Sequence, residues 1–132
     1  MRGAPGQRRG SVAIEFGLVL PVLLMLIAGT LDWGMALQRQ VALVDVTRDA
    51  ALAGARATAA QGPEAVARAR ALEGLTTAGL SATAATITTS RVTLTAGVAL
   101  KVHVSTPSDP AFALVGMPST FGGTTVALLE NP

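Results

Sequence analysis

The side chains that could perform chemistry are few in this chain, and they are not grouped. The 132 residues include no cysteine, no tyrosine and a single histidine, His103. Asp45 and Asp49 stand one helical turn apart, but Arg48 is adjacent and no histidine or cysteine is near, so we interpret them as a solvated helix face. No serine stands in a nucleophile-elbow or Ser-x-x-Lys pattern. We therefore predict no enzyme, no catalytic residues, no metal, no cofactor and no small-molecule substrate.

One carboxylate stands in an unusual place, because Glu15 is the single charge in the apolar segment 12–31. A carboxylate in hydrocarbon costs free energy unless it lies near the interface or has a partner. Glu15 is only four residues from Ser11, so one interpretation places it at the level of the lipid headgroups. The other is that the chain is cut before Ser11, so that the new ammonium pairs with Glu15 one turn away, within one chain or between subunits.

The element that carries Glu15 is predicted to be a membrane-spanning helix. Twenty residues, 12–31, form a helix about 30 Å long, which matches the hydrocarbon core of a bilayer. Hydrophobic residues make up 50% of the chain and charged residues 14%, and the mean hydropathy is +0.51. Arg2, Arg8 and Arg9 precede the segment and Trp33 follows it, which predicts a cytoplasmic N-terminus and an outward-facing C-terminal body.

Two other interpretations of the basic N-terminus are weaker. The net charge of +2 comes from the first ten residues, because the remainder has seven basic and eight acidic side chains. A nucleic-acid partner is therefore not predicted. A secretory signal peptide has a similar outline, but its apolar region is shorter, and here Glu15 interrupts that region. No good small-x-small cleavage site follows Leu31.

The segment Gly10-Ser11-Val12-Ala13-Ile14-Glu15-Phe16 resembles the processing site of type IV pilins and pseudopilins. That site has a basic leader ending in Gly, a cut after the Gly, Glu at the fifth mature position and then an apolar helix. The longer stretch 9–31 and the Asp-Ala-Ala-Leu-Ala-Gly-Ala-Arg sequence at 49–56 are similar to TadE-like proteins of the tight-adherence (Tad/Flp, type IVb) pilus system. The resemblance covers about residues 8–56.

The resemblance implies a role in a pilus. Residues 1–10 would be a prepilin-type leader that a prepilin peptidase removes between Gly10 and Ser11. Glu15 and Phe16 would set the register of assembly with other pilins or pseudopilins of the same system. The protein would be a pseudopilin or minor pilin in the cytoplasmic (inner) membrane, with a periplasmic or extracytoplasmic body. The alternative is a membrane-anchored envelope binding or structural module with no pilus role.

Pro21 lies inside the predicted span. It removes one helix N–H and frees the carbonyl of Gly17, so a kink or softened turn is predicted there. One interpretation is a tolerated membrane proline, which is common. The other is a helix that bends or locally melts when it moves from the bilayer into a filament.

The helical pattern continues beyond the membrane, so residues 32–60 are predicted to extend the same helix. Its apolar stripe is Trp33, Leu37, Val41 and Val44. Gln61-Gly62-Pro63 should break it, and Pro63 is expected to open a short second helix that ends at Gly74 or Gly79.

Period-two alternation then predicts strand over residues 91–105, either as one long strand or as a hairpin that turns at Ala96-Gly97. A separate strand is expected around Ile87, before Ser90, and a last strand at 124–129, with Phe121-Gly122-Gly123 as loop. The fold class is thus α+β and pilin-like. Residues 61–132 form a small module in which a three- or four-stranded antiparallel sheet packs on the long helix.

Overall fold

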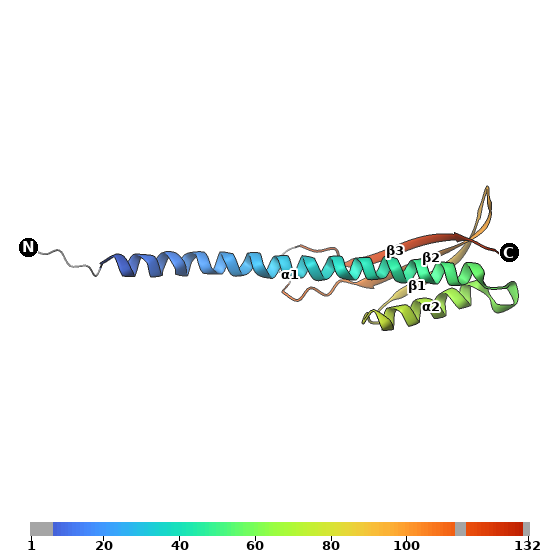
Figure 1. Cartoon of the computed structure of the whole chain (residues 1–132), viewed down its shortest axis with the longest axis horizontal. Helices are drawn as coiled ribbons and strands as arrows, with labels where there is room; N and C mark the ends of the chain where they lie inside the picture. Colours follow the sequence, from blue (N-terminus) through green and yellow to red (C-terminus); the bar gives the residue numbers. More distant parts are fainter. Residues whose placement is uncertain (1–6, 113–115, 131–132) are drawn as a thin grey trace, which may run out of the picture.

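A computed structural model describes residues 7–112 and 116–130, and for residues 7–11 only the course of the backbone. A long helix, α1 (Gln7–Arg56), is followed by a 3-10 turn, η1 (Ala59–Gln61), and a second helix, α2 (Pro63–Thr77). Three strands follow: β1 (Thr86–Leu94), β2 (Gly97–Pro107) and β3 (Thr120–Leu128). The helix pair and the sheet form a module around the C-terminal half of α1, while the N-terminal half projects alone (Figure 1). This arrangement confirms the predicted α+β class.

Helix α1 is longer at its start and shorter at its end than predicted. It begins at Gln7 rather than residue 12, runs without a break through Pro21, and ends at Arg56 rather than residue 60. The early end follows from Thr58, whose backbone is extended and whose N–H donates to the Gln61 side chain at 3.0 Å. That local hydrogen bond starts a separate 3-10 turn in place of the last helical turn.

Helix α2 begins at Pro63, as predicted, and of the two candidate glycines Gly79 ends it. Gly79 has a φ of +70°, and the amides of Gly79 and Leu80 donate back to carbonyls of the last helical turn. This is the Schellman arrangement that favours glycine. Gly74 instead stays within the helix, where an added Cβ would lie 3.1 Å from Val46 of α1. It allows the two helices to approach closely.

The strand segment forms a hairpin and not one long strand. β1 and β2 pair antiparallel with Leu94 opposite Gly97, so Thr95 and Ala96 form a two-residue turn. Gly97, with a φ of +133°, supplies a conformation that other residues rarely adopt. The predicted break before Ser90 is wrong, because β1 continues through it as a single strand from Thr86 to Leu94.

Strand β3 starts earlier than predicted, and the interpretation of Phe121-Gly122-Gly123 as loop is wrong. All three residues pair with β2, which occupies the centre of the sheet order β1-β2-β3. A Cβ added at Gly123 would lie 2.9 Å from Thr47 Oγ1 and 3.3 Å from the carbonyl oxygen of Leu43, both on α1. Glycine is present there because the strand passes directly over the helix, not because the chain turns.

The core lies where α1, α2 and one face of the sheet meet, so the long helix supplies one side of it, as predicted. The buried residues are mostly small on the helices and β-branched or leucine on β2, which matches the predicted alternation. They are Leu43, Val46, Ala50, Ala51, Ala67, Ala71, Leu75, Leu100, Val102, Val104 and Leu129.

An ion pair joins α2 to the outer strand β1. Arg91 Nε donates to Glu64 Oε1 at 2.6 Å, and Arg91 Nη2 donates to Oε2 at 3.2 Å. The hydrogen bond from Arg91 lowers the pKa of Glu64 below its usual 4.5. Both side chains are more than a third exposed, so solvent screens the pair.

We expect Glu64→Gln to have a small effect that depends on pH. A carboxyl group with a lowered pKa stabilises the fold above the unfolded pKa, and this contribution is lost as the pH falls below 4.5. At pH 7 the variant should change the unfolding equilibrium by at most about fivefold, as exposed pairs do. At pH 3 the difference from the parent should shrink. Urea midpoints at both pH values measure this, and equal losses at the two would contradict it.

Candidate functional site

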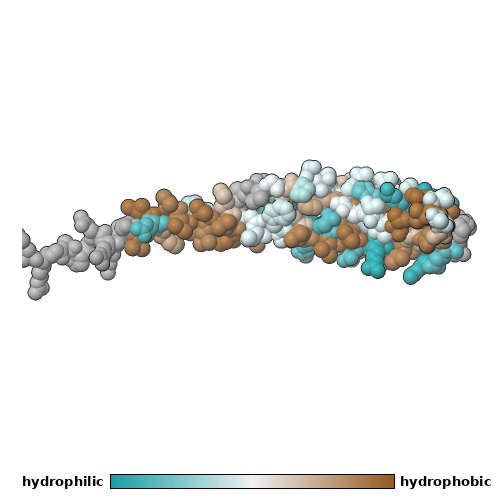
Figure 2. All heavy atoms as spheres, turned by 90° about the horizontal axis from the view of Figure 1, so that it is seen from above, coloured by the Kyte–Doolittle hydropathy of each residue, from teal (hydrophilic) through white to brown (hydrophobic). Residues whose placement is uncertain are grey.

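The main surface feature is an exposed apolar helix. Every large apolar side chain from Val12 to Leu31 is exposed, from 37% at Leu20 to 75% at Leu18. The most apolar stretch of α1 has a mean hydropathy of 2.4, and the helix is long and apolar enough to cross a membrane. Figure 2 shows this apolar surface covering the projecting half of the molecule. An apolar surface of this size requires a bilayer or other helices around it.

The predicted processing and register residues all fall on the first turns of α1. Gly10 and Ser11 lie in its backbone, but their side chains and residues 1–6 are outside the described part of the chain. Ser11 and Glu15 are four residues apart in continuous helix, which is the one-turn spacing that their pairing needs. Phe16, the next residue, is 64% exposed and is available to a neighbouring helix.

The two residues predicted to soften the helix lie in its exposed, uninterrupted part. A Cβ added at Gly17 would meet nothing within 4 Å. Pro21 is a helical residue on the apolar surface. Bending at this point stays a prediction, supported by the absence of packed neighbours around Gly17 that would hold the turn.

The apolar stripe predicted beyond the membrane lies outside the module's core. Trp33, Leu37, Val41 and Val44 are 42%, 60%, 61% and 44% exposed. The face of α1 that packs on the module is a different one, with Ala36, Leu43, Val46, Thr47 and Ala50. That face combines small residues with Leu43 and Val46, and the side chains of the predicted stripe remain on the outside. The apolar surface of the span therefore continues for about three turns beyond Leu31.

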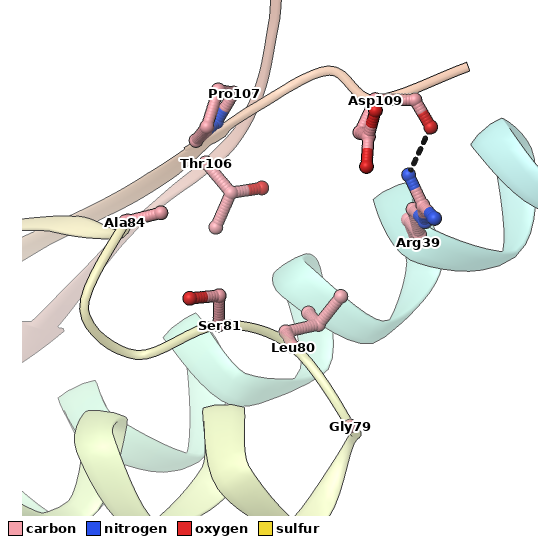
Figure 3. A pocket seen from close by; sticks show the side chains of 8 residues that line it. All are labelled: Arg39, Gly79, Leu80, Ser81, Ala84, Thr106, Pro107 and Asp109. Carbon is pink, nitrogen blue, oxygen red and sulfur yellow. Dashed lines mark hydrogen bonds between the residues drawn. The ribbon is translucent and has the colours of Figure 1, made fainter. Parts of the chain in front are cut away.

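A cluster of polar contacts joins the end of the span to the β2–β3 loop. The Asp32 carboxylate, on a residue only 2% exposed, accepts hydrogen bonds from the backbone amides of Ala111 at 2.9 Å and Phe112 at 3.1 Å. Arg39 Nη1 donates to the Asp109 carbonyl at 2.9 Å, and Figure 3 shows this guanidinium reaching across to the loop. These contacts were not predicted from the sequence, because each joins residues at least 70 positions apart.

The pocket beside Arg39 does not bring catalytic groups together. It encloses about 300 Å³ and is lined by the residues labelled in Figure 3, whose one basic group already holds the loop. His103 is elsewhere, on the face of the central strand β2 that points away from the core, with Nδ1 2.8 Å from Thr124 Oγ1. Asp45 and Asp49 are exposed on α1, as predicted. Among residues 7–112 and 116–130, no group of three or more His, Asp or Glu side chains could hold a metal ion.

The Gly-Ala-Arg element at 54–56 has a structural role at the far end of α1. Gly54 lies where α1 meets both α2 and β2, with Pro63, Ala67 and Leu100 around it. Ala55 is buried, and its carbonyl accepts a hydrogen bond from the Glu130 amide at 3.0 Å. The element therefore lies at a close contact between α1 and α2 and is hydrogen-bonded to Glu130, beyond β3.

These features define a class of protein: one exposed apolar helix that continues into a small α+β module, the layout predicted from the resemblance to pilins. Residues 10–52 match the family model described as TadE-like protein. The match confirms the predicted resemblance over this segment, which is roughly a third of the 132 residues. No curated protein and no solved structure matches the chain.

Proposed function

We propose that the protein is a membrane-anchored pseudopilin or minor pilin that takes part in the initiation or assembly of a Tad/Flp type IVb pilus. The observation that carries this proposal is the TadE-like match, which starts at Gly10 and includes Glu15 within an exposed apolar helix. A prepilin peptidase would cut between Gly10 and Ser11. The mature protein would then start with a free ammonium group on the first turn of that helix.

The mechanism is non-covalent. The basic leader keeps the N-terminus in the cytoplasm, so the apolar helix spans the cytoplasmic (inner) membrane and the module lies outside it. In the assembly, the helix packs against helices of other pilins of the same system, and the Ser11 ammonium paired with Glu15 sets the register. Two findings support this mechanism: the helix continues unbroken through both positions, and the apolar side chains around them are exposed.

The exposed stripe on residues 33–44 supports the same proposal. It extends the apolar surface past the span, because the large apolar side chains of the stripe remain 42–61% exposed beside the module. In a filament this face would pack against the helix of a neighbouring pilin and lose its contact with water. Trp33 and Leu37, nearest the membrane, would be covered first.

The processing step is tested by the mass of the native protein. We expect the mature chain to be ten residues shorter than the sequence and to begin at Ser11, and to keep its leader when the peptidase is absent. Gly10→Leu should block the cut, while Gly6→Leu, a matched change within the leader, should leave it intact. Retention of Arg8-Arg9-Gly10 on the native protein would refute the processing proposal.

The alternative function, an envelope module with no pilus role, predicts the same anchoring and orientation. It differs because it predicts that changes at Gly10 and Glu15 have no effect on the function of the protein. Piliation of cells that carry these variants therefore separates the two proposals. A neighbouring gene for a secretion ATPase or a prepilin peptidase would also favour the pilus role.

A further inference from the structure

The β2–β3 loop turns away from the sheet toward the apolar half of α1. Its described residues that follow β2, 108–112, lie along α1 toward the N-terminus, where the amides of Ala111 and Phe112 contact Asp32 (Figure 1). Residues of this loop and of α1 line one small pocket together, and those from the helix run from Arg39 back to Asp32. The loop therefore reaches the level at which the predicted span ends.

Phe112 reaches further than the rest of the described loop. Its side chain, 51% exposed, lines an apolar groove of about 480 Å³ on α1. The other residues of the groove all belong to the predicted span: Pro21, Leu24, Met25, Ile27, Ala28 and Leu31. A side chain that shares a groove with these residues lies at their depth. When the helix crosses a bilayer, Phe112 is within the lipid as well.

We propose that residues 108–112 of this loop form a second membrane contact, in which Phe112 inserts into the outer leaflet beside the span and Asp32 holds this segment in place. Backbone N–H groups at this depth lack water and need an internal acceptor. Asp32 Oδ1 supplies it to Ala111 at 2.9 Å and to Phe112 at 3.1 Å. The same two hydrogen bonds offset the cost of a carboxylate at the end of the span.

Lipid is the occupant that the groove fits best. Leu24, Met25 and Leu31, on its helix side, are each about half exposed and are continuous with the rest of the apolar surface. The sequence from 110 to 129 has no charged residue, so no charge would have to leave water as the loop enters the interface. Trp33, 42% exposed and one residue past Asp32, is the residue type that anchors helices at the headgroup level.

The contact would fix the module relative to the membrane. A single helix leaves the attached module free to rotate about the helix axis and to move in depth. A second contact on one side of the helix removes both freedoms, so one face of α1 is held toward the loop.

This inference rests on the membrane placement of α1, which is part of the proposed function, and the experiment tests the two separately. The full-length protein is reconstituted in phosphatidylcholine–phosphatidylglycerol vesicles that contain brominated phosphatidylcholine. Trp33→Phe removes the only tryptophan, and single tryptophans are then introduced by Phe112→Trp, Leu24→Trp and Leu94→Trp. The tryptophan at position 24 reports the environment of the span. The tryptophan at position 94, at the hairpin end of β1, reports the environment of the module far from the membrane.

We expect bromine to quench the tryptophan at 112 nearly as strongly as the one at 24, and to leave the one at 94 unquenched. Quenching at 24 alone, with position 112 open to aqueous iodide, overturns the loop contact and leaves the span intact. Quenching at none of them refutes the membrane placement itself. A tryptophan at 112 that neither bromine nor iodide reaches overturns the lipid proposal in favour of a second protein chain.

The role of Asp32 is tested in the same background. Asp32→Ala should reduce bromine quenching at position 112 at least about twofold and leave quenching at position 24 unchanged. Asp45→Ala, which removes an exposed carboxylate from the same helix, should change neither. Unchanged quenching at 112 in the Asp32→Ala protein overturns the holding role of this carboxylate. An unchanged emission spectrum at position 94 shows that the module remains folded.

Discussion

Gly54→Ala is expected to lower the free energy of unfolding of the module by about 3 kcal/mol, at the upper end of the usual range for overpacked cores. An added Cβ would clash with Leu100 Cδ2, and it would lie 2.7 Å from the carbonyl oxygen of Pro63 and 2.8 Å from the Cβ of Ala67. The leucine can rotate away. The backbone oxygen and the alanine Cβ cannot move without separating α1 from α2, so the whole helix contact must shift.

The same substitution on the same helix gives a matched control. Gly34→Ala introduces a Cβ that meets nothing within 4 Å. It should stabilise α1 by about 0.5–1 kcal/mol, because alanine loses less backbone entropy than glycine in a helix. The two variants should therefore have opposite effects.

Hydrogen exchange of the β2 amides in the full-length protein in mild detergent measures both effects. These amides lie between two neighbouring strands, so opening them requires the module to unfold. Gly54→Ala should speed their exchange by about a hundredfold, the equivalent of 3 kcal/mol. Exchange as slow as in the parent would mean that the helices do not approach as closely at Gly54 as the structure shows.

Much of the fold was predictable because its signals are local. Pro63 opens α2 and Gly79 closes it through the backbone restrictions of these two residue types, which do not depend on distant neighbours. The period-two pattern over 91–105 likewise placed the buried face of β2. The choice between a hairpin and a long strand stayed open, because Gly97 is compatible with both.

The features that the sequence did not predict depend on contacts between distant residues. Gly122 and Gly123 have the local signature of a loop, yet they form a strand because α1 lies directly against Gly123. The stripe that starts at Trp33 has a helical period, but the period alone does not tell which face the module covers. The contacts of α2 and the sheet with the face that carries Leu43 and Val46 decide that.

The candidate site likewise has one part that the sequence predicted and one part that it did not. The spacing from Gly10 to Glu15 is a local motif, so its residues could be named from the sequence alone. The contact of Asp32 with the amides of Ala111 and Phe112 spans about 80 residues and involves backbone groups, which carry no residue-type signal. An acidic residue directly after the apolar segment was the only visible sign of it.

Glu15→Ala is expected to leave processing intact and to abolish most pilus assembly. In the proposed mature protein, the Ser11 ammonium would lie one turn from the Glu15 carboxylate, in a region that assembly would bury among apolar helices. Removing one partner of a buried ion pair costs about 3–5 kcal/mol, because the remaining charge is left uncompensated. Such a loss at each incorporation step corresponds to a decrease of more than about a hundredfold in the equilibrium for adding a subunit.

Two measurements on the same cells separate processing from assembly. The mass of the membrane-bound protein should show the ten-residue shortening in both parent and variant, while sheared surface pili should be nearly absent in the variant alone. Asp49→Ala provides the control, since it removes an exposed carboxylate farther along α1 and should change neither result.

Each contrary result has a distinct physical meaning. If the Glu15→Ala protein kept its leader, the carboxylate would act in recognition by the peptidase and not in register. If it were processed and assembled normally, the ammonium would reach water or another acceptor at the interface, as it does when Glu15 lies at the headgroup level. Glu15→Asp tests the ion pair itself, because it keeps the charge but shortens the reach by one methylene. Partial assembly with Asp and none with Ala would indicate that the pair needs both the charge and the one-turn distance.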